Sequence, residues 1–86
     1  MKTDRDVLIA WGLREAEKDG LWVRGIATDD AVAVVEYDAI AKIWRIAHVF
    51  QRRGTGKAAK RDCINEAWEF MSRVYYAKKL AEARNE

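Results

Sequence analysis

The stretch LWVRGIATDDAVAVVEYDAIAKIWRIAHVF, residues 21–50, decides the fold of this chain. It contains three runs rich in Val, Ile and aromatic residues, at 21–27, 32–37 and 43–50, and the short polar breaks TDD and DAIAK separate them. Runs of this composition are typical of β-strands, and short polar breaks between them are typical of hairpins. We therefore predict three antiparallel strands.

Alternation divides the third predicted strand into two faces, because successive side chains of a strand point to opposite sides of a sheet. One face comprises Trp44, Ile46, His48 and Phe50, and the other comprises Ile43, Arg45, Ala47 and Val49. Both faces are partly apolar. We expect one of them to carry the helices and the other to form a contact surface.

A helix is expected before the strands. Thr3 followed by Asp6 resembles a capping box with Asp in place of Glu, which marks a helix start, and an apolar pattern with helical spacing follows. Gly12 weakens this helix. Gly20 suits its end, because glycine enters the left-handed conformation without steric cost. The pattern predicts a helix over residues 4–19.

The helical period returns after the strands. The apolar stripe comprises Cys63, Ile64, Ala67, Trp68, Met71, Val74 and Tyr75. It predicts a long helix over residues 55–82 that supplies much of the core, followed by a polar tail over residues 83–86. Residues 1–86 are thus expected to form a single α+β domain, a two-layer αβββα fold with a three-stranded antiparallel sheet and two helices on one face.

Composition limits the class of protein. A chain of 86 residues buries only about 60–65% of its unfolded surface, so it supports one core. Half of the residues are hydrophobic, which argues against intrinsic disorder. The single cysteine, Cys63, has no internal disulfide partner, and the charged start lacks the apolar run of a signal peptide. No apolar stretch approaches the roughly 18–20 residues of a membrane helix. We expect a cytoplasmic protein without a membrane segment.

Positive charge is concentrated in the second half of the chain. Residues 1–50 carry seven Lys or Arg against nine Asp or Glu, a sum of −2, and residues 51–86 carry nine against five, a sum of +4. The segment QRRGTGKAAKR, residues 51–61, holds five cations and two glycines without an acidic side chain. Glycines before a helix leave backbone N–H groups accessible, and the helix dipole adds about half a positive charge there. The segment predicts an anion-binding turn suited to phosphate.

The run Gln51-Arg52-Arg53-Gly54-Thr55-Gly56-Lys57-Ala58 resembles the Q/R-x-x-G-x-G/A signature of the GNAT acetyltransferases. This resemblance implies that the turn binds the pyrophosphate of acetyl-CoA or CoA. The implied cofactor contacts are Gln51, Arg53, Gly54, Gly56 and Lys57. The family continues past this helix into a further strand and helix that have no counterpart here, so the resemblance covers the first half of that fold and implies no catalytic residue.

A second resemblance is to double-stranded RNA-binding domains, which share the order helix, three strands, helix and a basic GxG turn. The arm-binding domain of phage-type integrases also places a helix after three strands. Either resemblance implies phosphate contacts, with affinity that falls steeply in salt. The residues implied are Arg52, Arg53, Lys57, Lys60 and Arg61.

Several single side chains have both a structural and a functional interpretation. His48 has no metal-ligand partners at suitable spacing, so we expect it to be structural. Glu36 is an exposed strand carboxylate, or a base if acetyl transfer occurs. Cys63 is expected to be a small buried hydrophobe. The four tryptophans belong to the core, unless one or two are exposed as a protein-binding hot spot; they are Trp11, Trp22, Trp44 and Trp68.

Three functions remain open. The first is a non-catalytic binding or regulatory module that engages a partner macromolecule, most readily a protein, through the basic turn and a partly apolar sheet face. The second is a truncated GNAT-like protein that binds acetyl-CoA or CoA, and the third is a nucleic-acid phosphate-backbone binder. A homodimer is compatible with each of them. A solvated turn without a ligand is the alternative interpretation of residues 51–61.

Overall fold

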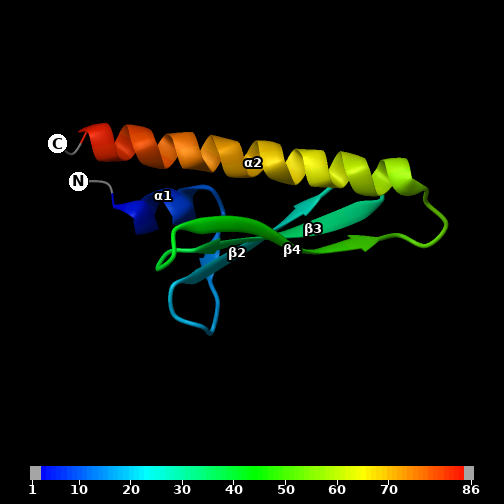
Figure 1. Cartoon of the computed structure of the whole chain (residues 1–86), viewed down its shortest axis with the longest axis horizontal. Coiled ribbons are helices and arrows are strands. Elements are labelled where there is room, and N and C mark those ends of the chain that lie inside the picture. The colour runs from blue at the N-terminus through cyan, green and yellow to red at the C-terminus, as the bar shows by residue number, and fades with distance from the viewer. Residues whose placement is uncertain (1–2, 85–86) are drawn as a thin grey trace.

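The computed structural model describes residues 3–84 and shows two helices and a four-stranded antiparallel sheet (Figure 1). The elements are α1 (Asp4–Ala10), β1 (Arg14–Glu15), β2 (Leu21–Ala27), β3 (Ala31–Asp38), β4 (Ile43–Gln51) and α2 (Lys57–Arg84). The sheet order is β1-β2-β3-β4, so each strand pairs with its neighbours in the sequence. The predicted α+β class is confirmed, and the predicted number of strands is wrong by one.

Helix α1 begins where the sequence predicts. The backbone N–H of Asp6 donates to Thr3 Oγ1 over 3.2 Å, and the N–H of Thr3 donates to the carboxylate of Asp6 over 3.0 Å. These reciprocal bonds form the predicted capping box and satisfy donors that would otherwise lack partners at a helix start.

Helix α1 ends at Ala10, so the prediction of a longer helix is wrong. Gly12 has a φ of +81°, and its N–H donates to the carbonyl of Ile9, while the N–H of Leu13 donates to the carbonyl of Leu8. This pair of bonds is the Schellman motif, which stops a helix at a left-handed glycine. Leu13 and Leu8 both belong to the same core cluster, and this packing fixes the direction in which the chain leaves α1.

Arg14 and Glu15, which were predicted to belong to the first helix, form strand β1. Arg14 pairs with Val23 and Glu15 pairs with Trp22. Gly20, expected to end the helix, instead takes a φ of +80° in the turn before β2. Two paired residues show no recognisable periodicity, which is why the sequence analysis missed this strand.

Strands β2, β3 and β4 match the prediction to within one residue at each end. Strand β4 contains a feature that was not predicted. Val34 pairs with His48 and Val35 pairs with Ile46, so Ala47 has no opposite residue and forms a β-bulge. A bulge changes which residues share a face on its two sides.

The bulge makes the predicted faces of β4 wrong. Trp44, Ile46 and Val49 are partly buried and pack against the core beneath α2. His48 and Phe50 are exposed on the opposite side of the sheet, although strict alternation places them with Trp44. The apolar residues of β4 therefore lie on both sides of the sheet, some in the core and others, such as Phe50, in contact with solvent.

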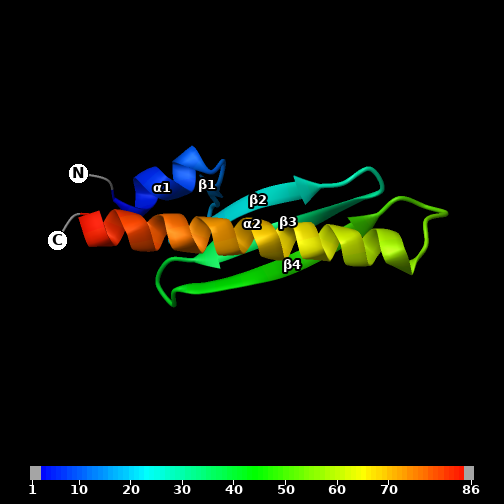
Figure 2. The same cartoon turned by 90° about the horizontal axis from the view of Figure 1, so that it is seen from above.

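Helix α2 covers one side of the sheet and starts two residues later than predicted (Figure 2). Its 28 residues extend over about 42 Å at 1.5 Å per residue, and its C-terminal half lies beside α1. The first two residues of the predicted polar tail, 83–84, belong to this helix, and residues 85–86 lie outside the described part.

The core lies between the sheet and the helices in two clusters. The first contains Val7, Leu8, Leu13, Trp22, Tyr37, Val74 and Ala81. The second contains Ala31, Ala33, Val35, Cys63, Ala67 and Met71. Cys63 is fully buried, which confirms its interpretation as a small hydrophobe. No helix among residues 3–84 covers the other side of the sheet, so its side chains face solvent.

Candidate functional site

The basic turn, residues 51–57, connects β4 to α2 and is open to solvent. Gly54 has a φ of +87°, a conformation that side chains with a Cβ rarely adopt. A Cβ added at Gly54 or Gly56 would meet no heavy atom within 4 Å. Helix α2 begins at Lys57, so the glycines lie immediately before its first turn. An anion can approach the backbone at this point without displacing a side chain.

Gln51 closes the basic turn from within. Its side-chain Nε2 donates to the carbonyl of Thr55 over 2.8 Å and to the carbonyl of Gly56 over 2.6 Å. The hydroxyl of Thr55 in turn donates to the carbonyl of Arg52 over 2.7 Å. These bonds give Gln51 a role in holding the turn, and its assignment as a CoA contact stays a prediction.

One of the five predicted anion-binding cations has a partner in the protein itself. The Arg52 guanidinium lies 2.6 Å from Oδ1 of Asp30, in the hairpin between β2 and β3. The other four are exposed and form no ion pair with any residue of 3–84; they are Arg53, Lys57, Lys60 and Arg61. The last three lie within about 100° of the α2 circumference at 3.6 residues per turn. The structure therefore brings these four cations to one end of the molecule.

The outer face of the sheet, which points away from α2, lies next to the basic turn. Its side chains are Val23, Val32, Val34, Glu36, Ile43, Arg45, His48 and Phe50. Phe50 is 61% exposed, and its ring lies 5.9 Å from that of His48. A shallow hollow of about 330 Å³ is lined by Val32, Phe50 and Arg52 among others. Phe50 and Arg52 thus lie side by side, in a hollow that Asp29 and Asp30 also line.

Glu36 and His48 were considered as a possible base and a possible metal ligand. Glu36 accepts a hydrogen bond of 2.8 Å from Nε of Arg45 in an ion pair on the outer face. No group of three or more potential metal ligands converges on His48 or elsewhere in residues 3–84.

A row of exposed aromatic residues on α2 was not predicted. Trp68, Tyr75 and Tyr76 are 52%, 47% and 66% exposed, although the sequence analysis placed the first two in the core stripe. They line a groove of about 200 Å³ together with Trp44 of β4. The sheet ends at β4, so this flank of the helix has no strand beneath it. Trp22 is buried as expected, and Trp11 and Trp44 pack partly buried against the core.

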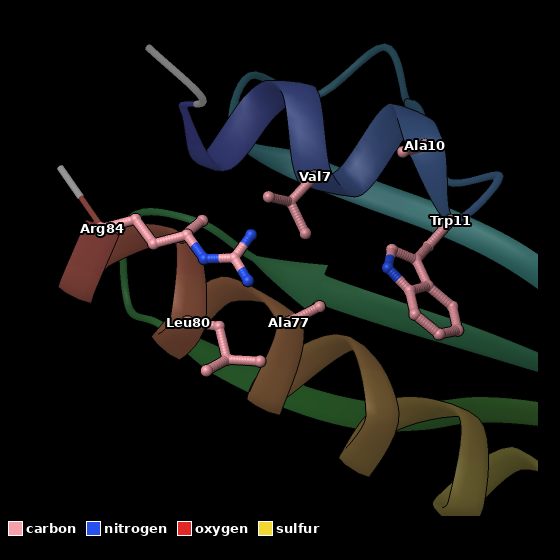
Figure 3. A pocket seen from close by; sticks show the side chains of 7 residues that line it. Val7, Ala10, Trp11, Ala77, Leu80 and Arg84 are labelled. Atoms are coloured by element: carbon pink, nitrogen blue, oxygen red, sulfur yellow. The ribbon is translucent and has the colours of Figure 1, made fainter.

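Helices α1 and α2 enclose a second kind of site, a mostly apolar pocket of about 350 Å³. Figure 3 shows Val7 of α1 and Trp11, the next residue after α1, pointing toward α2, with the Arg84 side chain extending between the two helices. Ligand specificity usually depends on several placed polar groups. Here Arg84 is the one charged side chain in the lining, so the pocket offers contact area with little to select a ligand.

Lys78 is a buried cation that sequence reasoning missed. It is 8% exposed, and its Nζ lies 2.5 Å from the hydroxyl of Tyr37 and 4.0 Å from the centroid of that ring. Asp4 lies 3.6 Å away. Lys78 therefore joins α2 to β3 and to the start of α1, and it has a structural role.

Asp38 holds the turn between β3 and β4. The backbone N–H groups of Ala41 and Ile40 each donate to its Oδ1 over 3.0 Å. These bonds favour the ionised carboxylate, and the bond from Ala41 is the main cause that lowers the pKa of Asp38 below its ordinary value.

Comparison of the chain with protein-family models, with curated proteins and with solved structures found no match in any of the three. Within residues 3–84, neither helix combines the length and the apolar character needed to cross a bilayer.

Proposed function

We propose that this chain is a non-catalytic binding module that engages a protein partner through the outer face of the sheet and the basic turn. The observation that carries the proposal is the position of Phe50. Its side chain is exposed on a face of the sheet that no helix of residues 3–84 covers, and Arg52 and Arg53 of the basic turn follow it by two and three residues. Exposed apolar side chains that cluster beside charged ones are typical of protein-binding surfaces.

The apolar part of the surface supplies an anchor. Ile43, Val32 and Phe50 are all exposed on the outer face, and the hollow beside Phe50 gives the partner a recess to fill. A buried aromatic residue at the centre of an interface often contributes more than 2 kcal/mol to binding. Phe50 is the best candidate for that position.

The charged part of the surface selects the partner. Arg53 and Lys57 have no ion-pair partner among residues 3–84, and Arg53 follows Phe50 by three residues. Complementary charge steers association and excludes partners of like charge. The proposed partner therefore presents acidic side chains around an apolar recess or ridge.

Binding is favoured over acetyl transfer because residues that the GNAT resemblance would use are occupied. Gln51 donates its amide N–H groups within the turn, and Glu36 is paired with Arg45. Both contacts would have to break for these side chains to reach a cofactor or a substrate.

The proposal is tested by affinity capture with tagged wild-type protein and with Phe50→Asp, followed by quantitative mass spectrometry. At least one protein is expected to bind the wild type and to lose about tenfold or more of its signal with Phe50→Asp, since loss of a hot-spot contact exceeds 1.4 kcal/mol. Leu80→Asp, at an exposed site on α2, is the matched control and is expected to retain the partner. Arg53→Glu is expected to weaken the purified complex and to reduce its salt dependence.

Circular dichroism of each variant checks that the fold is intact. The proposal fails if Phe50→Asp captures the same proteins as the wild type, or if Leu80→Asp loses them equally.

A further inference from the structure

We propose that the flank of α2 beside β4 is a binding site for single-stranded nucleic acid, with bases stacked on its aromatic rings and phosphates held by cations at both ends. Its rings lie on a different face of the molecule from the outer face of the sheet, and Lys57 is a residue that both proposed sites use. We call it the aromatic flank and define it by Trp44, Trp68, Tyr75 and Tyr76.

The rings gather along one groove, in which Tyr75 and Tyr76 meet edge to face with their centroids 5.6 Å apart. Trp68, Tyr75 and Tyr76 of α2 line one groove with Trp44 of β4, and Trp44 and Tyr75 also line a neighbouring pocket of about 220 Å³. Trp68 and Tyr75 are seven residues apart, two helical turns, so their side chains are about 10 Å apart along the helix axis. Each of the three aromatic residues on α2 is about half exposed or more. Exposed rings at this spacing can stack bases without sequence preference.

Cations extend the platform at both ends. Lys57 and Arg61 precede Trp68 by eleven and seven residues, which places each within about 20° of it around the helix. At the other end, Lys79 and Lys42 line the pocket that contains Tyr75, and Nζ of Lys79 lies 5.6 Å from the Tyr75 ring. A chain of phosphates running along α2 would therefore meet positive charge before and after the rings.

Acidic side chains lie at the edges of this flank. Asp62, Glu66 and Glu69 lie at least about 100° around α2 from Trp68, whereas Glu69 and Asp62 lie within about 40° of Tyr76. Glu69 is paired with Arg73. Glu82 is the one acidic residue in the lining of the two pockets. Along the line of Trp68 and Tyr75, cations therefore outnumber carboxylates, which favours a polyanion.

A nucleic acid fits this flank better than a protein does. Exposed aromatic rings suit both kinds of partner, but lysine is depleted in protein interfaces, whereas rings interleaved with cations are typical of single-strand binding. A duplex fits poorly, because its bases are stacked on one another and leave no face for the rings.

The size of the site sets the length of the ligand. Lys57 and Lys79 are 22 residues apart, about 33 Å along the helix. A strand has one phosphate per 3.4 Å or more, so about ten nucleotides or fewer cover the distance. A thymidine oligonucleotide of twelve residues therefore reaches from the cations near Lys57 to those near Lys79. One of four residues reaches only one of these two groups.

The test is fluorescence anisotropy with fluorescein-labelled dT12 at 50 mM NaCl. The wild type is expected to bind dT12 about tenfold or more tightly than dT4, and its tryptophan fluorescence is expected to be quenched. Trp68→Ala and Tyr75→Ala are each expected to raise the Kd about fivefold or more, the typical loss of one stacked base. Lys57→Ala and Lys79→Ala are each expected to reduce the salt slope by about 0.7.

Two variants serve as controls. Leu80→Ala changes an exposed apolar residue of α2 outside the two pockets, and Phe50→Asp changes the surface of the proposed protein interaction. Both are expected to bind dT12 as the wild type does, so failure of this inference is distinguishable from failure of the proposed function.

Three outcomes would overturn the inference. The first is no binding of dT12 at 50 mM NaCl, and the second is equal binding of a duplex of the same length. The third is an unchanged Kd with Trp68→Ala and Tyr75→Ala in proteins shown to be folded. If Trp68→Ala instead converts a dimer to a monomer in light scattering while dT12 binding is unchanged, the aromatic flank is a self-association surface and the inference is wrong.

Discussion

Alanine substitutions at the two glycines of the basic turn are expected to have different effects on stability. At Gly54, with its φ of +87°, a Cβ costs about 1–2 kcal/mol because of the left-handed conformation. No neighbouring atom lies within 4 Å, so no steric overlap adds to this cost. Reduced freedom of the unfolded chain offsets about 0.4–1 kcal/mol. The net loss for Gly54→Ala is therefore about 0.5–1 kcal/mol.

Gly56 is the matched control. Its φ lies outside the left-handed region, and a Cβ there also meets nothing within 4 Å. It immediately precedes α2, where alanine is a poorer cap than glycine by about 0.5 kcal/mol, and the effect on the unfolded chain offsets a similar amount. Gly56→Ala is expected to change the free energy of unfolding by less than about 0.5 kcal/mol.

Urea denaturation followed by circular dichroism at 222 nm measures both variants against the wild type. The expected difference between them, about 0.5–1 kcal/mol, corresponds to about 2–8 °C in Tm for a domain of this size. Equal stability of the two variants, or a Gly54→Ala protein as stable as the wild type, would refute the backbone geometry of the basic turn, which is part of the proposed protein-binding surface.

Three further outcomes are expected. Lys78→Met should lose about 1–3 kcal/mol in urea denaturation, because it leaves the buried hydroxyl of Tyr37 without its hydrogen-bond partner, and Lys78→Ala should lose more because it also removes packing on Tyr37. Asp38→Ala should lower the Tm at pH 7; since the folded pKa of Asp38 is lowered, its contribution is present above the unfolded pKa and is lost as the pH falls through the folded pKa, so the two Tm values should converge in acid. Acetyl-CoA at 1 mM should leave the Tm unchanged within about 1 °C, and a rise of several degrees would favour the acyl-CoA alternative instead.

The candidate site was predictable only in part. The open turn with Gly54 could be expected from the sequence, since glycines and cations before a helix are a local signal. The pairing of Arg52 with Asp30 could not, because the two residues are far apart in the chain and meet through the order of the strands. The exposure of Trp68 also depends on tertiary structure. Its spacing matches the buried stripe, and only the end of the sheet at β4 leaves it uncovered.

The sequence by itself determined the three long strands, the capping box at Thr3 and the long second helix, because each arises from contacts between residues near one another in the chain. The end of α1 at Gly12 is also a local feature, although the apolar pattern concealed it. Only the tertiary structure decided which side of the sheet Phe50 faces and that Lys78 is buried. Strand β1 and the bulge at Ala47 form when separate segments pair, and burial depends on which elements cover a residue. These are properties of distant contacts, which no local pattern encodes.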